Sequence, residues 1–358
     1  MATERIISAQ TSTPAEEHQN WSLRPERIDE YVGQRELIER LGIAIEASKS
    51  RAEPVEHILL HGPPGLGKTT LAHVIAREMD RKLHTTSGPA LARGTDLVSS
   101  LTRLEAGDVL FIDEIHRLPI AVEEFIYPAM EDFRIDVTVD AGLHARTVQI
   151  TCKPFTLIGA TTRAGLLSAP LRSRFGLLHH LKYYGLDELS AILSRSASLL
   201  SVGPIAPEAV TRIAERSRGT PRIANRLLRR VRDFAVVRGD GAVTTKLVDD
   251  ALKLEGVDEL GLDELDRSYL RTIGEVYEGG PVGLETVSAT MNEDSGTLED
   301  VVEPYLLQIG FLARTRRGRM LTRQSAAFLG IAFTPESERE PQRSGEGLFG
   351  AGRSDADE

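Results

Sequence analysis

Cysteine is nearly absent from this chain of 358 residues, and its scarcity excludes one common way of holding a fold together. With Cys152 as its single cysteine, the chain cannot form an intrachain disulfide, and a metal site built on thiolates is not expected. Long hydrophobic runs are also absent, since none approaches the roughly 18 residues that cross a bilayer. The first 20 residues lack the charged-then-apolar pattern of a secretion signal. We therefore expect a cytoplasmic protein.

An excess of positive charge is lacking too, because 43 lysines and arginines stand against 53 acidic residues, a net charge of −10. This balance argues against a protein that is basic all over, but it leaves room for a local basic patch. With 41% hydrophobic and 27% charged residues, the composition is that of an ordinary soluble globular protein. The length has room for two or three domains with ample core.

A glycine-rich segment, residues 62–70, carries the strongest chemical signal. Its sequence GPPGLGKTT fits the phosphate-binding loop G-x-x-x-x-G-K-[ST]. In such a loop the backbone N–H groups point at the phosphates, Lys68 places its charge on the β and γ oxygens, and Thr69 offers a hydroxyl to Mg²⁺. The apolar run 58–60 predicts a buried strand, and 70–79 predicts a helix whose N-terminal dipole favours the anion. A surface turn rich in glycine and proline is the plain alternative, and the flanking strand and helix argue against it.

Strands that alternate with helices between residues 21 and 184 predict a parallel sheet with both faces covered. Residues 1–20 are polar and lack periodicity, so we expect a disordered tail. The expected strands are 58–60, 82–86, 109–112, 155–162 and 177–184, and the expected helices are 35–49, 70–79 and 121–131.

After about residue 185 the strand signals stop, and four helices are expected before residue 255. Pro221 suits the first turn of the third helix, with Thr220 as its cap. These four helices are predicted over 187–200, 207–217, 221–237 and 246–254.

A third unit is expected over 256–334, with three small helices followed by a two-stranded wing. This order is typical of a winged helix. Pro304 is expected to bend or break the third helix. The helices are predicted over 262–277, 283–291 and 297–308, the strands over 311–314 and 319–321, and residues 335–358 are interpreted as a flexible tail.

Two acidic residues follow the buried strand 109–112. The carboxylate of Asp113 would stand at the carboxyl end of that strand, where ligands of α/β sheets bind, and it can hold Mg²⁺ through water. Glu114 is the natural general base for the water that attacks the γ-phosphate. Two acids often end a strand, so their position 45 residues after Lys68 is what favours a functional interpretation.

Thr161 and Thr162 end the next buried strand. A hydroxyl at that place can orient the attacking water, although a turn that caps the strand would have the same sequence.

Three arginines are candidates for contact with the nucleotide. Arg172 and Arg174 lie just before Phe175, and an arginine placed on a neighbouring subunit's γ-phosphate would stabilise the transition state. A solvated turn is the alternative, and the sequence does not say whether either residue acts in trans. Arg222 opens a helix of the helical unit, where it is well placed for a nucleotide.

Residues 314–323 hold five arginines and no acid, which on a wing is typical of a surface that contacts a phosphate backbone. A solvated charge run is the alternative. Without interleaved aromatic residues the patch predicts little readout of bases. The five are Arg314, Arg316, Arg317, Arg319 and Arg323.

Alternating apolar residues on both sides of a turn at 140–142 predict a β-hairpin over 135–150, with one apolar face and Leu143 near the tip. If it packs on its own domain, the hairpin is ordinary core. If it projects, it is a docking site for a partner.

Together these features resemble the AAA+ ATPases, and in particular the RuvB family, the Holliday-junction branch-migration motors of bacteria. The resemblance covers roughly residues 21–334, and its combination of motifs is highly specific. The matching segments are 23–25, 31–34, 62–70, 111–118, 130–133, 155–163, 172–176, 219–225, 303–306 and 310–312.

The resemblance implies an α/β fold class: an AAA+ parallel-sheet P-loop domain over 21–184, then an all-α helical lid over 185–255 and a C-terminal winged-helix DNA-binding domain over 256–334. It also implies ATP and Mg²⁺ as cofactors.

The resemblance further assigns roles to individual residues. The adenine pocket would be lined by Leu23, Arg24 and Tyr184, and the phosphates would be held by Gly65, Gly67, Lys68, Thr69 and Thr70. Mg²⁺ would be bound by Thr69 and, through water, by Asp113; the catalytic set would be Lys68, Asp113, Glu114, the sensor Thr162 and the arginine finger Arg174. The second sensor would be Arg222, the stretch Glu131, Asp132 and Phe133 would lie near the nucleotide, and DNA would be touched by Arg314, Arg317 and Arg319.

The implied partners are duplex DNA at Holliday junctions, RuvA bound through the hairpin 135–150, RuvC in a resolution complex, and further copies of the chain in a six-membered ring. One position departs from the family's pattern. Where the family often has an arginine before the third helix of the last domain, this chain has Ser295, which removes one possible DNA contact.

The leading hypothesis is thus an ATP hydrolase that acts as a DNA helicase or translocase and drives branch migration in recombination and repair. The first alternative is an AAA+ replication initiator or loader with a winged helix, against which the hairpin and the match at 303–312 argue. The second is a scaffold that binds nucleotide without catalysis, which intact Lys68, Asp113 and Glu114 make the weakest of the three.

Overall fold

The computed structural model describes residues 6–7, 21–139 and 146–332, in two compact units, Met1–Glu264 and Leu265–Glu358. Each unit is described by itself below. Within the described residues, no helix has the length and apolar character needed to cross a membrane.

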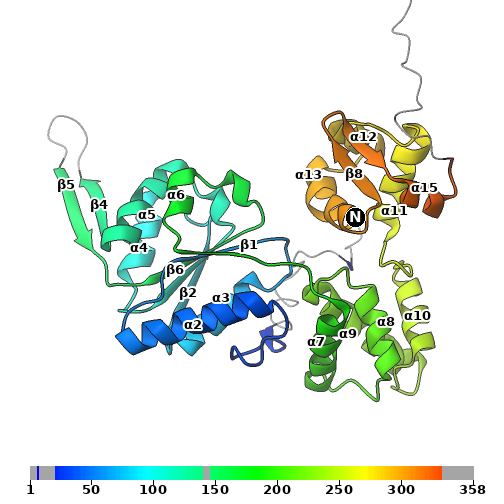
Figure 1. Ribbon diagram of the computed structural model, residues 1–358, viewed down its shortest axis with the longest axis horizontal. Helices are drawn as coiled ribbons and strands as arrows, with labels where there is room; N and C mark the ends of the chain where they lie inside the picture. The colour runs from blue at the N-terminus through cyan, green and yellow to red at the C-terminus, as the bar shows by residue number, and fades with distance from the viewer. Residues whose placement is uncertain (1–5, 8–20, 140–145, 333–358) are drawn as a thin grey trace, which may run out of the picture. The chain divides into compact units, whose positions relative to one another are not determined.

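A five-stranded parallel sheet forms the centre of the first unit, with the strand order β2-β3-β6-β1-β7 (Figure 1). The predicted parallel sheet is therefore confirmed, and the order brings the strand before the phosphate loop between β6 and β7. The strands are β1 (Ile58–His61), β2 (Leu83–Ser87), β3 (Val109–Asp113), β6 (Thr156–Thr161) and β7 (Leu177–His180).

Alternate residues of these strands enter two separate cores, one on each face of the sheet. Ile58 and Leu60 belong to one core and Leu59 to the other, because successive side chains of a strand point to opposite faces. Apolar residues of α2 and α3 complete the first core, and those of α4 and α5 complete the second. The bounds are α2 (Arg35–Arg51), α3 (Lys68–Glu78), α4 (Gly94–Thr102), α5 (Ile120–Asp132) and α6 (Ala169–Ser173); the sequence analysis did not anticipate α4 and α6.

Four helices follow the sheet, as predicted, and the first core continues into them through residues such as Leu193 and Leu227. Thr220 stands at the cap position of α9, but its hydroxyl donates to the carbonyl of Arg218 (3.1 Å) instead of accepting from the helix. Thr220 is therefore the N-cap residue, as predicted, and Pro221 begins the helix, but the cap forms no side-chain hydrogen bond to the helix. The helices are α7 (Leu186–Leu199), α8 (Pro207–Glu215), α9 (Pro221–Arg238) and α10 (Thr245–Leu254).

The predicted hairpin is present as an antiparallel pair, β4 (Arg134–Val139) and β5 (Arg146–Thr151), which is separate from the main sheet. Figure 1 shows it extending beyond α4 and α5. Ile135 at its base is buried, and Val148 further along is exposed. Leu143, expected near the tip, lies outside the described residues.

The second unit contains the predicted helices and wing. Pro304 lies in the first turn of α14, and the segment just before it has π-helical geometry, so the third helix is interrupted where expected. A last helix, α15, was not anticipated. The elements are α11 (Glu264–Arg271), η3 (Thr272–Val276), α12 (Leu284–Met291), α13 (Ser295–Thr297), η4 (Leu298–Val302), α14 (Glu303–Gln308), β8 (Leu312–Thr315), β9 (Gly318–Leu321) and α15 (Arg323–Leu329).

Part of the expected N-terminal tail is ordered. Ile6 and Ile7 are buried within the first core, and Nη1 of Arg226 on α9 donates to the carbonyl of Ile6 (3.0 Å). The periodicity argument could not find this contact, because two adjacent apolar residues show no period.

Leu41 and Ile43 on α2 provide a test of the first core. Leu41 is 0% exposed and Ile43 is 64% exposed. We expect Leu41→Ala to lower the free energy of unfolding by about 2–5 kcal/mol, since it leaves a cavity in a packed core. The matched control Ile43→Ala should change it by less than about 0.5 kcal/mol. Urea unfolding followed by circular dichroism measures both, and equal effects would contradict the assigned helix face.

Candidate functional site

The phosphate loop joins the end of β1 to the start of α3, as the sequence predicts. Gly62 (φ 140°) and Gly67 (φ 98°) adopt backbone conformations that residues with side chains rarely adopt. There is no space for side chains either: a Cβ would lie 2.5 Å from the carbonyl oxygen of Leu181 at Gly62, and 2.8 Å from the hydroxyl of Tyr31 at Gly67. The loop therefore packs closely against Leu181 and Tyr31. It ends at the N-terminus of α3, where the helix dipole favours an anion.

Lys68 is buried at the start of α3 with its ammonium group turned back to the loop. Its Nζ donates to the carbonyl oxygens of Gly62 and Pro63, both at 2.8 Å. Burial lowers the pKa of Lys68 to about 8; the nearby carboxylate of Asp113 opposes this shift and the charge of Arg222 adds to it. The site therefore holds a cation in surroundings that disfavour its charge, so a bound anion would stabilise it.

Asp113 ends β3, and its Oδ1 accepts a hydrogen bond from the backbone N–H of Glu114 (2.9 Å). Burial raises the pKa of Asp113, while that hydrogen bond and the charge of Lys68 work in the other direction. A carboxylate whose charge is disfavoured by burial is stabilised by a cation. The threonine hydroxyl and carboxylate expected to hold Mg²⁺ are oxygen donors of the kind this ion uses, and phosphate oxygens and waters supply the other ligands at such sites. The described residues contain no cluster of three or more His, Cys, Asp or Glu side chains that could hold a metal ion.

Glu114 directly follows the strand, and its backbone is left-handed (φ 48°). Its Oε2 accepts a hydrogen bond from Nη1 of Arg117 (2.9 Å), and the side chains of both are substantially exposed. The candidate base is therefore held by a surface ion pair, which is a weak interaction that can be exchanged. No sequence motif marks Arg117 as the partner of Glu114.

The two threonines at the end of β6 are not equivalent. Thr161 is buried. Its hydroxyl oxygen lies 2.9 Å from Nδ1 of His116 and accepts a hydrogen bond from the backbone N–H of Arg163 (3.0 Å). Thr162, the expected sensor, lies just beyond the strand and is exposed. The bond between Thr161 and His116 connects this strand to the segment that follows Glu114, and sequence spacing carried no signal for it.

Arg174, the expected finger, lies at the C-terminal end of α6 and contacts residues of its own chain. Its Nη1 donates to the carbonyl of Pro170 (2.8 Å), its Nη2 lies 3.1 Å from Oε1 of Glu131, and its guanidinium lies 4.4 Å from the ring centre of Tyr127. Within the described part of the chain, its Nε has no hydrogen-bond partner although it is buried. None of these contacts is with the phosphate loop of the same chain.

The stretch 131–133 ends α5 beside this arginine. The structure therefore brings Glu131 together with Arg174, two residues that the sequence could not pair. Asp132 pairs with Arg134 (3.2 Å), and the ring of Phe133 packs edge-on against that of Phe155.

The side chains expected around adenine come from two segments, residues 23–24 and residue 184. Leu23 is buried, and its carbonyl accepts from Nη1 of Arg195 (2.9 Å). Arg24 lies over the ring of Trp21, 4.7 Å from its centre. Tyr184 is buried; its hydroxyl donates to the carbonyl of Leu66 (3.2 Å).

Tyr184 also connects the phosphate loop to the helical domain. Its hydroxyl contacts Leu66 in the loop, and its N–H donates to the carbonyl of Gly219 (2.9 Å), just before α9. Arg222 is the second residue of α9, and its charge influences the pKa of both Lys68 and Asp113. The expected second sensor therefore lies near enough to Lys68 and Asp113 for its charge to act on both.

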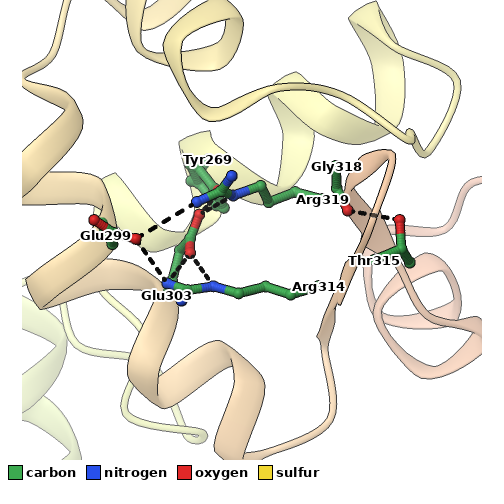
Figure 2. A network of polar contacts seen from close by, with 7 residues as sticks. All are labelled: Tyr269, Glu299, Glu303, Arg314, Thr315, Gly318 and Arg319. Atoms are coloured by element: carbon green, nitrogen blue, oxygen red, sulfur yellow. Dashed lines mark hydrogen bonds and ion pairs between the residues drawn. The ribbon is translucent and has the colours of Figure 1, made fainter. Parts of the chain in front are cut away.

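In the second unit, Arg314 on β8 and Arg319 on β9 converge on Glu303 (Figure 2). Arg316 and Arg317 lie exposed at the turn between the strands. Ser295 begins α13, where Asp294 caps the helix by accepting from the N–H of Thr297 (2.8 Å).

The first unit combines a parallel sheet, a phosphate loop after β1, an acidic pair at the end of β3 and a helical domain whose Arg222 lies near Lys68 and Asp113. These features define an AAA+ P-loop ATPase with a lid, and the second unit adds a winged helix. Comparison with models of known protein families identifies the family of AAA+ ATPases to which the chain belongs. The model for the Holliday junction DNA helicase RuvB P-loop domain matches residues 23–181, that for the RuvB AAA lid domain matches 184–258, and that for the RuvB C-terminal winged helix domain matches 259–330.

Individual relatives agree with the family models. The chain is 55% identical over 317 residues to the Holliday junction branch migration complex subunit RuvB of Kosmotoga olearia, covering 88% of this chain and 92% of that protein. It resembles the solved structure of the Thermotoga maritima RuvB Holliday junction branch migration motor with a TM-score of 0.79 and 50% identity, over 87% of this chain and 100% of that one. A mutant of the same Thermotoga protein gives a TM-score of 0.80 at 50% identity, over 87% and 99%. The chain belongs to the RuvB family, and the predicted fold class is confirmed.

The lowered pKa of Lys68 predicts how nucleotide binding depends on pH. As pH rises through about 8, the nucleotide-free site loses the charge that attracts phosphate. We expect the affinity for a non-hydrolysable ATP analogue to fall above pH 8, by up to about tenfold per pH unit. Lys68→Arg should show no such decline, because its guanidinium stays charged. Fluorescence titrations between pH 7 and 9.5 measure both, and parallel declines would exclude Lys68 as the cause.

Proposed function

We propose that this chain is an ATP-driven motor that moves duplex DNA and drives branch migration of Holliday junctions in recombination and repair. The observation that most supports the proposal is that charged groups of two domains lie near one another beside the phosphate loop. Lys68 and Asp113 come from the sheet domain, and Arg222 comes from the lid and is close enough to influence the pKa of both. A site built this way can convert the loss of the γ-phosphate into movement of the lid.

In the proposed reaction, Glu114 polarises the water that attacks the γ-phosphate, and Thr162 orients it. Thr69 and, through water, Asp113 would hold Mg²⁺, which would supply positive charge to the phosphates. The bond of Glu114 to Arg117 has to be exchanged for one to water, which an exposed pair permits at little cost.

We propose that Arg174 completes the site of a neighbouring copy in a homohexameric ring. Support comes from its contacts, since Arg174 bonds Pro170 and Glu131 of its own chain and not its own phosphate loop. Glu131 and Tyr127 would then hold the guanidinium ready for the adjacent nucleotide. Hydrolysis in each subunit would thereby depend on the next one in the ring.

The remaining roles follow the family's pattern. The wing, through Arg314, Arg317 and Arg319, contacts DNA phosphates, and the hairpin 135–150 binds RuvA, with RuvC joining in a resolution complex. The projection of the hairpin beyond α4 and α5 supports docking over ordinary core (Figure 1). The protein would act in the cytoplasm, where its DNA substrate lies.

A junction assay tests the proposed function directly. We expect the wild-type chain with ATP and RuvA to dissociate a synthetic four-way junction. Glu114→Gln should still bind ATP but lose turnover and junction dissociation by about 10²-fold or more, because it lacks the general base.

The alternative, an initiator or loader with a winged helix, would hydrolyse ATP without dissociating the junction or depending on RuvA. Undiminished steady-state hydrolysis by Glu114→Gln would instead exclude Glu114 as the base.

Mixed rings test the role of Arg174. Arg174→Ala alone should lose turnover by about 10³-fold, and Lys68→Ala alone should fail to bind ATP. If Arg174 acts in trans, a Lys68→Ala subunit can supply its arginine to an intact site on an Arg174→Ala neighbour. We therefore expect mixtures of the two variants to recover part of the ATPase rate. Absence of recovery in rings shown to be mixed would assign Arg174 to its own site.

A further inference from the structure

Two arginines lie directly opposite each other on the two strands of the wing. Arg314 on β8 is paired in register with Arg319 on β9. Directly opposed residues of neighbouring strands have Cβ atoms about 5 Å apart, and like charges in this arrangement repel. Something must therefore hold the two guanidinium groups together.

The carboxylate of Glu303, the first residue of α14, lies between them and is 0% exposed. Its Oε2 accepts from Nε of Arg314 (2.7 Å) and also contacts Nη2 of that residue. Its Oε1 accepts from Nε of Arg319 (2.9 Å) and from the hydroxyl of Tyr269 (2.6 Å). Figure 2 shows both arginine side chains reaching the same carboxylate from the wing. Both oxygens of this buried carboxylate accept hydrogen bonds, so its position is fixed and it can fix the positions of the side chains that it binds.

Tyr269 also holds this carboxylate, through the oxygen that accepts from Arg319. It is fully buried, and burial together with its bond to Glu303 raises its pKa well above the usual range, so it remains a hydrogen-bond donor. Glu299 is more distant, with Oε1 3.8 Å from Nη2 of both arginines, and its side chain is partly exposed. Glu303 is therefore the acid that sets the geometry, and Glu299 contributes charge nearby.

The bonds to Glu303 use the Nε side of each guanidinium. Across the described portion of the chain, the Nη1 groups of Arg314 and Arg319 form no hydrogen bond. The side chain of Arg314 is 42% exposed and that of Arg319 is 19% exposed. A planar guanidinium held along one edge still offers donors along another, with its rotamer already restricted.

We propose that Glu303 is a positioning residue for DNA binding: it orients Arg314 and Arg319 side by side so that their outer donors bind backbone phosphate. The inference rests on the proposed function, in which the wing contacts DNA. This proposal predicts the opposite effect on DNA affinity from the one that the charge of Glu303 alone would have. A carboxylate beside two arginines should weaken binding to a polyanion, whereas a carboxylate that orients them should strengthen it.

The test measures the affinity of the full-length chain for mixed-sequence duplex DNA across a salt series. We expect Glu303→Gln to weaken binding about tenfold, because two side chains lose their fixed orientation. We expect Tyr269→Phe, which changes no charge, to weaken it about threefold. The matched control Glu299→Gln removes the same charge beside the same arginines, and it should bind as tightly as the wild type or more tightly.

A double variant separates positioning from general support of the fold. If Glu303 acts through the arginines, adding Glu303→Gln to Arg314→Ala/Arg319→Ala should change the affinity by less than about twofold. A further large loss would mean that Glu303 only supports the fold. Circular dichroism checks that each variant is folded, and if Glu303→Gln is not, Tyr269→Phe decides.

The outcomes also distinguish this inference from the proposed function. If Arg314→Ala/Arg319→Ala binds duplex DNA like the wild type, the proposed wing contacts are wrong and the inference fails with them. If that variant binds weakly but Glu303→Gln binds as tightly as Glu299→Gln, only the positioning role is overturned. Weakening by both Glu303→Gln and Tyr269→Phe, with no loss for Glu299→Gln, supports it.

Discussion

The nucleotide site depends on one buried charge, the ammonium group of Lys68. Burial disfavours this charge, as the lowered pKa of Lys68 reflects, and the nearby carboxylate of Asp113 offsets part of the cost. Arg222 adds a second positive charge from the lid. Two cations thus stand near one partly buried carboxylate whose own charge burial also disfavours. A polyanion such as a nucleoside triphosphate would stabilise both cations.

The sheet order is what makes this concentration of groups possible. In the order β2-β3-β6-β1-β7 the phosphate loop leaves β1, Thr161 ends the adjacent β6, and Asp113 ends β3, one strand further. All these strands are parallel, so their carboxyl ends lie at the same edge. Tyr184 then connects that edge to the lid through hydrogen bonds to Leu66 and Gly219. One residue thus contacts both the phosphate loop and the segment that begins α9.

Arginines with proposed roles are held differently in the two units, and the difference fits those roles. Arg174 pairs with Glu131, whose side chain is 55% exposed, and an exposed pair is weak and readily exchanged. Arg314 and Arg319 pair with Glu303, which is fully buried and cannot exchange its partners for water. A finger that has to engage another subunit needs the first arrangement. A surface that contacts a regular backbone at every step needs the second.

Much of this protein was determined by local sequence. The phosphate loop, the acids after β3, the run of lid helices, the hairpin and the interruption at Pro304 were all predictable, because each depends on neighbouring residues or on a short period. The family followed from the same motifs. Short helices without a strong period, α4, α6 and α15, were not predictable, and neither were the buried Ile6 and Ile7.

Only the tertiary structure decided which distant groups meet. His116 with Thr161, Glu131 with Arg174, and Glu303 with the two wing arginines are separated by 45, 43, 11 and 16 residues, and no spacing rule connects them. The sequence marked the arginines 314–323 as a run of charge without acid, and it placed Glu303 in a different element. Folding brings that acid between two arginines of the run, where its two oxygens accept hydrogen bonds from both guanidinium groups.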